Sequence, residues 1–134
     1  MAAADPRAAG SALTVDVAPI RRPDWSPLPG DGVVGVDGKV LVREADFFVA
    51  MLRFSRHATI HEHPGENDTL VVCVEGHGFT SVSGETAPLH ANERALWPAN
   101  VPHRLWTDDS RMTTLMVERP GVGFPLRGLA GTSG

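Results

Sequence analysis

Residues 61–76 read HEHPGENDTLVVCVEG, and this stretch decides the fold. His61 and His63 are two residues apart in a β-rich run, so on a strand both side chains leave the same face. Their imidazole nitrogens can then converge on one metal ion. The pair alone is a weak signal, because six histidines in 134 residues often produce an H-x-H by chance.

Short β-rich runs continue on both sides of this stretch. Gly, Pro, Asn and Asp separate them, and no segment shows the sustained 3.6-residue periodicity of an amphipathic helix. This pattern predicts an all-β barrel or sandwich. In VVGVDGKVLV, residues 33–42, the pair Asp37-Gly38 predicts a tight hairpin turn, whereas residues 45–52 fit a short helix or a strand. The other expected strands are 47–54, 58–63, 69–76, 79–84, 94–98, 103–107 and 112–118.

The two ends of the chain differ in composition from the middle. Residues 1–30 are Ala-rich and then Pro-rich, which predicts a flexible, extended arm, with Trp25 as a possible anchor. Residues 31–120 form the expected barrel domain. Residues 121–134 are rich in glycine and are expected to be a flexible tail.

Composition narrows the possible partners and surroundings. At 134 residues, the chain has room for one hydrophobic core. A net charge of -4 gives no basic field for nucleic acid or anionic membranes, and no apolar run approaches the roughly 20 residues of a membrane span. We therefore expect a small-molecule partner. The single cysteine, Cys73, and a start without a secretion signal predict a cytoplasmic protein.

A second segment strengthens the metal hypothesis. Residues 98–103 read PANVPH and open another expected strand. With the first stretch, this segment resembles the two motifs of the cupin family, which are His-x-His followed by Glu and Gly, and then Pro-x-Gly followed by His. His61, His63, Gly76, Pro98 and His103 match by position. The resemblance implies a double-stranded β-helix, a jelly-roll barrel, in which His61, His63 and His103 hold a divalent metal.

The acidic residue of the first motif is not fixed by this resemblance. Counting back from Gly76, the family's Glu position falls on Thr69, whereas counting forward from His63 reaches Asp68, and Glu66 lies two residues earlier. We rank Asp68 first as a ligand, Glu66 second, and third a site without an acidic ligand in which water completes the shell. Asp68 or Glu66 is also the candidate catalytic base.

The second motif departs from the family at three other positions. Asn92 and Asn100 stand where glycine is usual, and Asn is the next most tolerant residue of left-handed backbone. Thr107 replaces the terminal Asn. A site of mixed nitrogen and oxygen ligands with open positions suits Fe, Mn, Ni, Zn or Cu, and the sequence does not choose among these metals.

Alternation along the strands predicts which neighbours share the interior. Leu105 faces the same side as His103, and Trp106 faces the other. On the preceding strand, Cys73 faces inward if Thr69 does, whereas Leu70 and Val72 do so if Asp68 does. His57, His77 and His90 lie beside expected turns and are left out of the site. Further candidates for a cavity lining, each more simply explained as core, are Trp97, Trp106, Phe79, Phe54 and Met51.

Three functions compete at this stage. The resemblance favours a small metal-dependent enzyme, with dioxygenase-like chemistry ahead of isomerase, cyclase or lyase chemistry. The alternative is a non-catalytic module that binds or senses a small ligand, which the uncertain Glu position supports. A third hypothesis is a structural role, in which the barrel pairs with itself through an edge strand and the Pro-rich arm. Members of the family commonly form dimers, and we expect a homodimer here.

Overall fold

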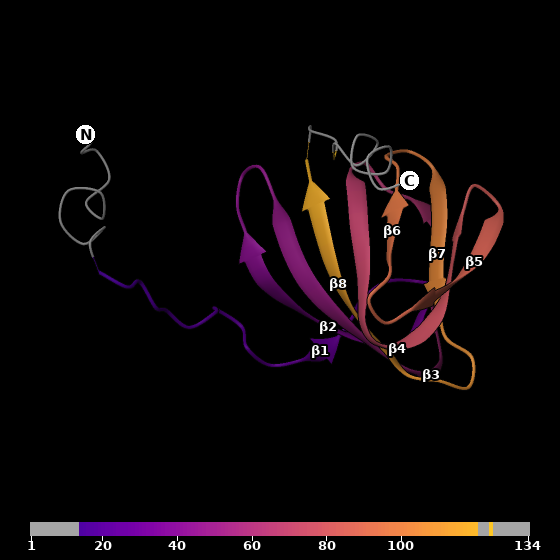
Figure 1. The fold of residues 1–134 in the computed structure, drawn as a ribbon, viewed down its shortest axis with the longest axis horizontal. Helices are drawn as coiled ribbons and strands as arrows, with labels where there is room; N and C mark the ends of the chain where they lie inside the picture. Colours follow the sequence, from indigo (N-terminus) through magenta and orange to yellow (C-terminus); the bar gives the residue numbers. More distant parts are fainter. Residues whose placement is uncertain (1–13, 121–123, 125–134) are drawn as a thin grey trace.

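Eight β-strands and no helix make up the part of the chain that the computed structural model describes, residues 14–120 and Phe124 (Figure 1). The predicted all-β jelly-roll fold is confirmed. The strands are β1 (Ser26–Pro27), β2 (Val33–Arg43), β3 (Phe48–Pro64), β4 (Asp68–Val82), β5 (Glu85–His90), β6 (Arg94–Trp97), β7 (Pro102–Trp106) and β8 (Met112–Arg119).

Antiparallel pairing closes the strands into a barrel. β3 pairs with β7, β7 with β4, β4 with β8, and β8 again with β3, so these four strands form a ring. β2 and β1 extend the sheet beyond β3, whereas β5 and β6 pair with β4. In Figure 1 the long strands β3 and β4 sweep from one side of the barrel to the other. Each therefore contributes to both walls.

These two strands are longer than the sequence predicts. The expected strands 47–54 and 58–63 are joined in β3, and 69–76 and 79–84 are joined in β4. The joins fall at residues with positive φ, His57 (57°) and Gly76 (74°). A Cβ at residue 76 would overlap the carbonyl group of Arg111, so the chain needs glycine there.

The hairpin predicted at Asp37-Gly38 is wrong. Both residues lie inside β2, where they face Arg53 and Leu52 of β3. A Cβ on Gly38 would come within 3.0 Å of the Leu52 side chain, so glycine serves a close approach between strands rather than a turn. The turn lies further along the chain, between β2 and β3, where the Glu44 amide donates to the Phe47 carbonyl at 2.9 Å.

The predicted asparagine turns are confirmed. Asn92 and Asn100 have φ angles of 74° and 64°, the left-handed conformation in which asparagine replaces glycine at low cost. The turn at Asn100 leads into β7, which begins at Pro102. The backbone geometry that presents His103 is thus kept despite the change of residue.

The core lies between the walls of the barrel. Phe54, Val71, Cys73 and Leu105 are fully buried, and Trp97 is 2% exposed. Full burial of a side chain of this size contributes roughly 1.5–3 kcal/mol. Leu105 shares the interior with His103, as alternation predicts.

The N-terminal arm is fastened to the barrel near residue 25. The Trp25 ring lies between two cations, with the Lys39 Nζ at 4.8 Å and the Arg53 guanidinium carbon at 4.3 Å from its centroid. β1 then pairs with the middle of β2. Residues 1–13 of the predicted arm, and the predicted tail except Phe124, lie outside the described residues. Within the described part of the chain, no helix has the length and apolarity of a membrane span.

Candidate functional site

Two of the three predicted histidines lie against each other, with His103 buried and His63 exposed. His63 of β3 and His103 of β7 are direct partners in the antiparallel register. Their ring centroids are 4.6 Å apart, and the planes meet at 69°. This pairing could not be obtained from spacing, because the residues are 40 positions apart and a β-bulge between Ile60 and His63 sets the register.

Both rings are oriented by backbone carbonyl groups. The His63 Nδ1 lies 2.8 Å from the His61 carbonyl oxygen, and the His103 Nδ1 lies 3.2 Å from the Val101 carbonyl oxygen. These contacts place the proton on Nδ1 in each neutral ring, so Nε2 carries the free lone pair. Metal-binding histidines usually donate the N–H of their other ring nitrogen to a carboxylate, a backbone carbonyl or water, and the carbonyl-bound Nδ1 of each ring fits that arrangement.

His103 is held more firmly than His63. Its side chain is buried and stacks on Trp97, with ring centroids 4.0 Å apart and planes within 10°. Trp97 in turn donates from Nε1 to the Thr80 hydroxyl at 2.9 Å. Burial, together with the charge repulsion of His63, lowers the pKa of His103 to about 4. His103 is therefore neutral at pH 7 and able to act as a ligand.

His61 lies in the same pocket but does not join the other two. Its backbone amide donates to the Gly32 carbonyl at 2.9 Å, and a Cβ on Gly32 would stand 2.7 Å from its ring. The glycine thus makes room for the His61 side chain. Among the described residues, no group of three or more His, Cys, Asp or Glu side chains is close enough to hold an ion.

The candidate acidic residues lie elsewhere. The Asp68 carboxylate accepts a hydrogen bond from the Ala99 amide at 2.8 Å, and so fastens the loop that precedes β7. Glu66 is exposed between β3 and β4. Thr69, at the family's Glu position, is 5% exposed and lines the pocket. The ligand and base roles of Asp68 and Glu66 remain predictions, and the geometry does not favour them.

The space around the histidines, which we call the histidine pocket, has a volume of about 790 Å³. This volume suits a small organic ligand. Residues 26–30 of the arm form one wall, although the sequence predicts only a flexible extension there. The apolar lining consists mainly of Leu28, Val33, Val40, Phe48, Ala50, Leu52, Ile60, Trp97 and Met116.

Three polar residues of the pocket escape the sequence analysis. Glu62 lies between the two histidines, and Asn67 donates from Nδ2 to the Glu118 carboxylate at 3.3 Å. On β8, Met112 and Thr114 are buried, and alternation along the strand places Glu118 on the same inner face. It was missed because the run 112–118 carries no motif.

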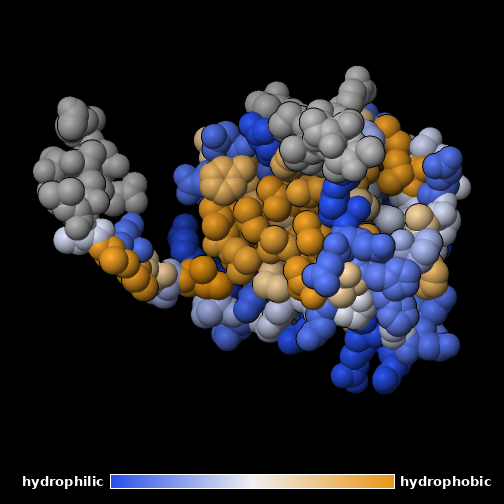
Figure 2. Space-filling view, viewed as in Figure 1, coloured by the Kyte–Doolittle hydropathy of each residue, from blue (hydrophilic) through white to orange (hydrophobic). Residues whose placement is uncertain are grey.

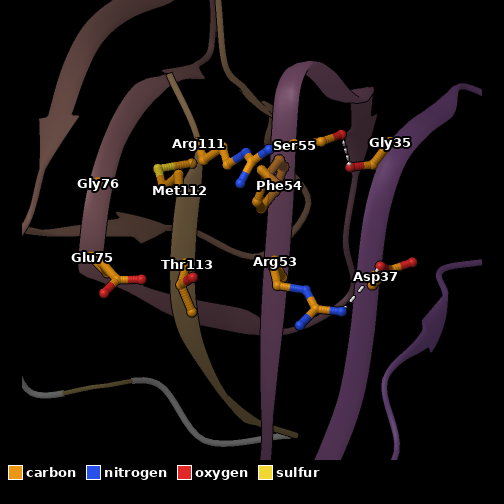
Figure 3. A pocket seen from close by; sticks show the side chains of 10 residues that line it. All are labelled: Gly35, Asp37, Arg53, Phe54, Ser55, Glu75, Gly76, Arg111, Met112 and Thr113. Carbon is orange, nitrogen blue, oxygen red and sulfur yellow. Dashed lines mark hydrogen bonds and ion pairs between the residues drawn. The ribbon is translucent and has the colours of Figure 1, made fainter. Parts of the chain in front are cut away.

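A second hollow of about 530 Å³ lies away from the histidines (Figure 3). Two of its charged groups are paired with each other, since Arg53 lies 3.4 Å from Asp37, and the Ser55 hydroxyl donates to the Gly35 carbonyl at 2.9 Å. Figure 3 shows Glu75 and Arg111 on the opposite side of this hollow. It contains none of the predicted site residues, so the histidine pocket is the candidate site.

Solved structures share this fold at low sequence identity. The polyketide cyclase RemF from Streptomyces resistomycificus matches with a TM-score of 0.69 and 14% identity, over 84% of this chain and 89% of that one. KdgF from Halomonas sp. matches with a TM-score of 0.65 and 19% identity, over 74% and 89%. An RmlC-like cupin from Shewanella frigidimarina matches with a TM-score of 0.65 and 17% identity, over 73% and 84%.

Sequence comparison gives the family directly. A comparison with curated proteins finds no match. The family model of the cupin domain matches residues 49–118, which is more than half of the chain and includes His61, His63 and His103. The chain therefore belongs to the cupin domain family.

Proposed function

We propose that this cupin is a small metal-dependent enzyme that acts on an organic molecule in the histidine pocket. His63 and His103 would hold a divalent ion through Nε2, and His61 would complete the set. The observation that carries the proposal is the paired orientation of two imidazole rings, each with Nδ1 on a backbone carbonyl. That arrangement leaves two nitrogen donors facing one pocket.

The donor set fits the proposed ion. Imidazole nitrogen suits Fe, Ni, Zn and Cu, whereas Mn would also need oxygen ligands, and the chain does not select one of these metals. When bound, the ion would supply Lewis acidity or, if it is redox-active, oxygen activation. The protein itself would orient the groups, because Trp97 stacks on the His103 ring and the apolar walls provide a surface for the bound molecule.

The reaction class is the least constrained part of the proposal. We favour dioxygenase-like chemistry ahead of isomerase, cyclase or lyase chemistry. Solved structures with this fold include a polyketide cyclase and a DMSP lyase, which supports the use of such barrels by enzymes. At 14% and 17% identity these structures do not assign a reaction to this chain.

Metal content and turnover test the proposal together. Purified protein, reconstituted with each of the five metals, is analysed for bound metal beside His63→Ala, His103→Ala and the control His77→Ala, an exposed histidine outside the pocket. We expect near-stoichiometric metal in the wild type and control and loss in both pocket variants. Oxygen consumption and product formation are then followed with a catechol and diketone panel. Absence of metal from the reconstituted wild type would contradict the proposal.

The alternative is a binding module without turnover. Thr69 favours it, because a threonine at the family's Glu position removes one anionic ligand. Saturable binding of a small molecule with no product would support this alternative. The third hypothesis, a purely structural barrel, gains no support from a pocket of about 790 Å³.

We further propose that the protein is a homodimer. Alternation places Val49 and Met51 of β3, Leu115 and Val117 of β8, and Leu70 and Val72 of β4 on the outside of the sheet, and we call these six residues the outer sheet face. The register aligns them in two rows, Met51–Leu115–Val72 and Val49–Val117–Leu70. Figure 2 shows a continuous apolar patch on one face of the molecule.

A second copy fits this face better than a charged partner does. Residues of both signs border the rows, with Arg94 opposite Val72 and Glu75 opposite Thr113 in the register. A twofold axis through the patch would bring unlike charges of the two copies together around an apolar centre. The same surface can therefore complement itself.

We also propose that the protein is cytoplasmic. Cys73 is fully buried, and burial raises the pKa of its thiol. A single buried thiol that stays protonated does not form a disulfide, so the protein does not need an oxidising compartment. Fractionation of cells that express the protein would test this.

A further inference from the structure

One row of side chains runs across the inner wall of the histidine pocket. The register aligns Phe48, Glu118, Thr69 and Trp97 on the neighbouring strands β3, β8, β4 and β6. Partners in such a row have Cβ atoms about 4.5–5.5 Å apart. All four line the pocket, and Trp97 at the end of the row stacks on His103. The row therefore connects Glu118 to the histidine pair along one wall.

Glu118 has hydrogen-bonding capacity to spare. In the described part of the chain, Asn67 donates to one of its carboxylate oxygens at 3.3 Å. A carboxylate accepts about four hydrogen bonds, so most of its capacity remains for a bound molecule. Glu118 is also partly buried, which strengthens a hydrogen bond to the charged group relative to one in water.

The wall beside this row is apolar. The next inward row consists of Val40, Ala50 and Met116. Leu28 of the arm and Ile60 of β3 add further apolar surface. A ligand that fills this space must be largely apolar, with any hydrogen-bond donor directed at the Glu118 row.

We propose that Glu118 selects the ligand class: apolar, ring-sized organic molecules that carry a hydroxyl or ammonium group, which donates to the carboxylate. This inference rests on the proposed use of the histidine pocket for a small molecule. Cations of the same pocket oppose it, since Arg22, Lys39 and Arg43 line the pocket and would attract an anion, and the Arg43 guanidinium carbon lies 4.5 Å from the centroid of the Phe48 ring in the same row. The test must therefore include an anionic probe.

Three probes of matched shape separate these possibilities: 2-naphthol, which donates a hydrogen bond, 2-methoxynaphthalene, which does not, and 2-naphthoate, which is anionic. Dissociation constants are measured by calorimetry on protein treated with a chelator. We expect 2-naphthol to bind wild-type protein about tenfold more tightly than either other probe, since a hydrogen bond to a charged group contributes roughly 1.5–3 kcal/mol. Glu118→Gln should remove most of that preference, and Glu75→Gln in the second hollow should keep it.

The wild-type comparison decides the question even if Glu118→Gln folds poorly. Equal binding of the three probes, tightest binding of 2-naphthoate, or no binding of any probe below about 1 mM would overturn the proposal. Because the metal is removed beforehand, failure of the metal-dependent function leaves this result unaffected. Conversely, a protein that binds metal but shows no preference for 2-naphthol refutes only the role of Glu118.

Discussion

At the scale of single residues, spacing predicted the histidines but not the acid. His61 and His63 follow from one motif and His103 from another, and the structure places all three in one pocket. The sequence alone did not decide whether Thr69 or Asp68 faces the interior from β4. Burial of Thr69, Val71 and Cys73 settles it, because a strand can bury only alternate residues on one face. Glu118, one of the acids that line the pocket, comes from a distant strand that no local motif marks.

Acid should weaken the fold through His103. Its pKa is about 4 in the folded protein, below the ordinary histidine value of about 6.5, so protons bind the unfolded chain more tightly. The contribution of neutral His103 is complete above pH 6.5 and is lost as the pH falls towards 4. Urea unfolding of chelator-treated protein at pH 7 and pH 5 should therefore show a larger loss for wild type than for His103→Gln. Equal losses would contradict this account.

At the scale of elements, the positions of the strands were predictable from the sequence. That pairs of predicted strands join into the long strands β3 and β4 was not. Glycine beside Asp37 signals a hairpin by composition, yet Gly38 is used for close contact with Leu52 inside β2. The same residue type serves turns, bulges and close approaches, and only tertiary packing distinguishes them. Gly76 differs from Gly38, because the family motif marks its position and the residue has a left-handed backbone conformation in the middle of β4.

Gly76→Ala should destabilise the barrel more than Gly84→Ala. Both glycines have positive φ, 74° and 85°, so both substitutions carry the cost of a left-handed alanine, roughly 1–2 kcal/mol. A Cβ at residue 76 would also overlap the Arg111 carbonyl, whereas nothing lies within 4 Å of a Cβ at residue 84. The difference in the free energy of unfolding between the two variants therefore measures the cost of the overlap at residue 76. A difference near zero would show that β4 and β8 can separate freely at this point.

At the scale of the whole molecule, the barrel has two apolar surfaces with different roles. The histidine pocket lies inside, partly walled by the arm, and the outer sheet face lies on the reverse of the same strands. The fold class and the two motif segments were predictable because they depend on local pattern. The arm's place beside the pocket was not, because it depends on pairing between β1 and β2.

The outer sheet face predicts a dimer in solution. Sedimentation equilibrium should show wild-type protein at twice the 14.3 kDa of one chain. Val117→Asp, at the centre of the face, should weaken the dimer by at least about tenfold, because the interface would bury an unpaired carboxylate. Val34→Asp is the matched control, since Val34 is 58% exposed and lies outside the face. A wild-type monomer at high concentration would contradict the proposal.

The most direct test of the central claim is to locate the metal in a crystal of reconstituted protein. An anomalous difference map, recorded on both sides of the absorption edge of the added metal, gives the position without reference to activity. We expect one peak about 2.0–2.1 Å from the Nε2 atoms of both His63 and His103. A peak at other residues, or none in the histidine pocket, would contradict it.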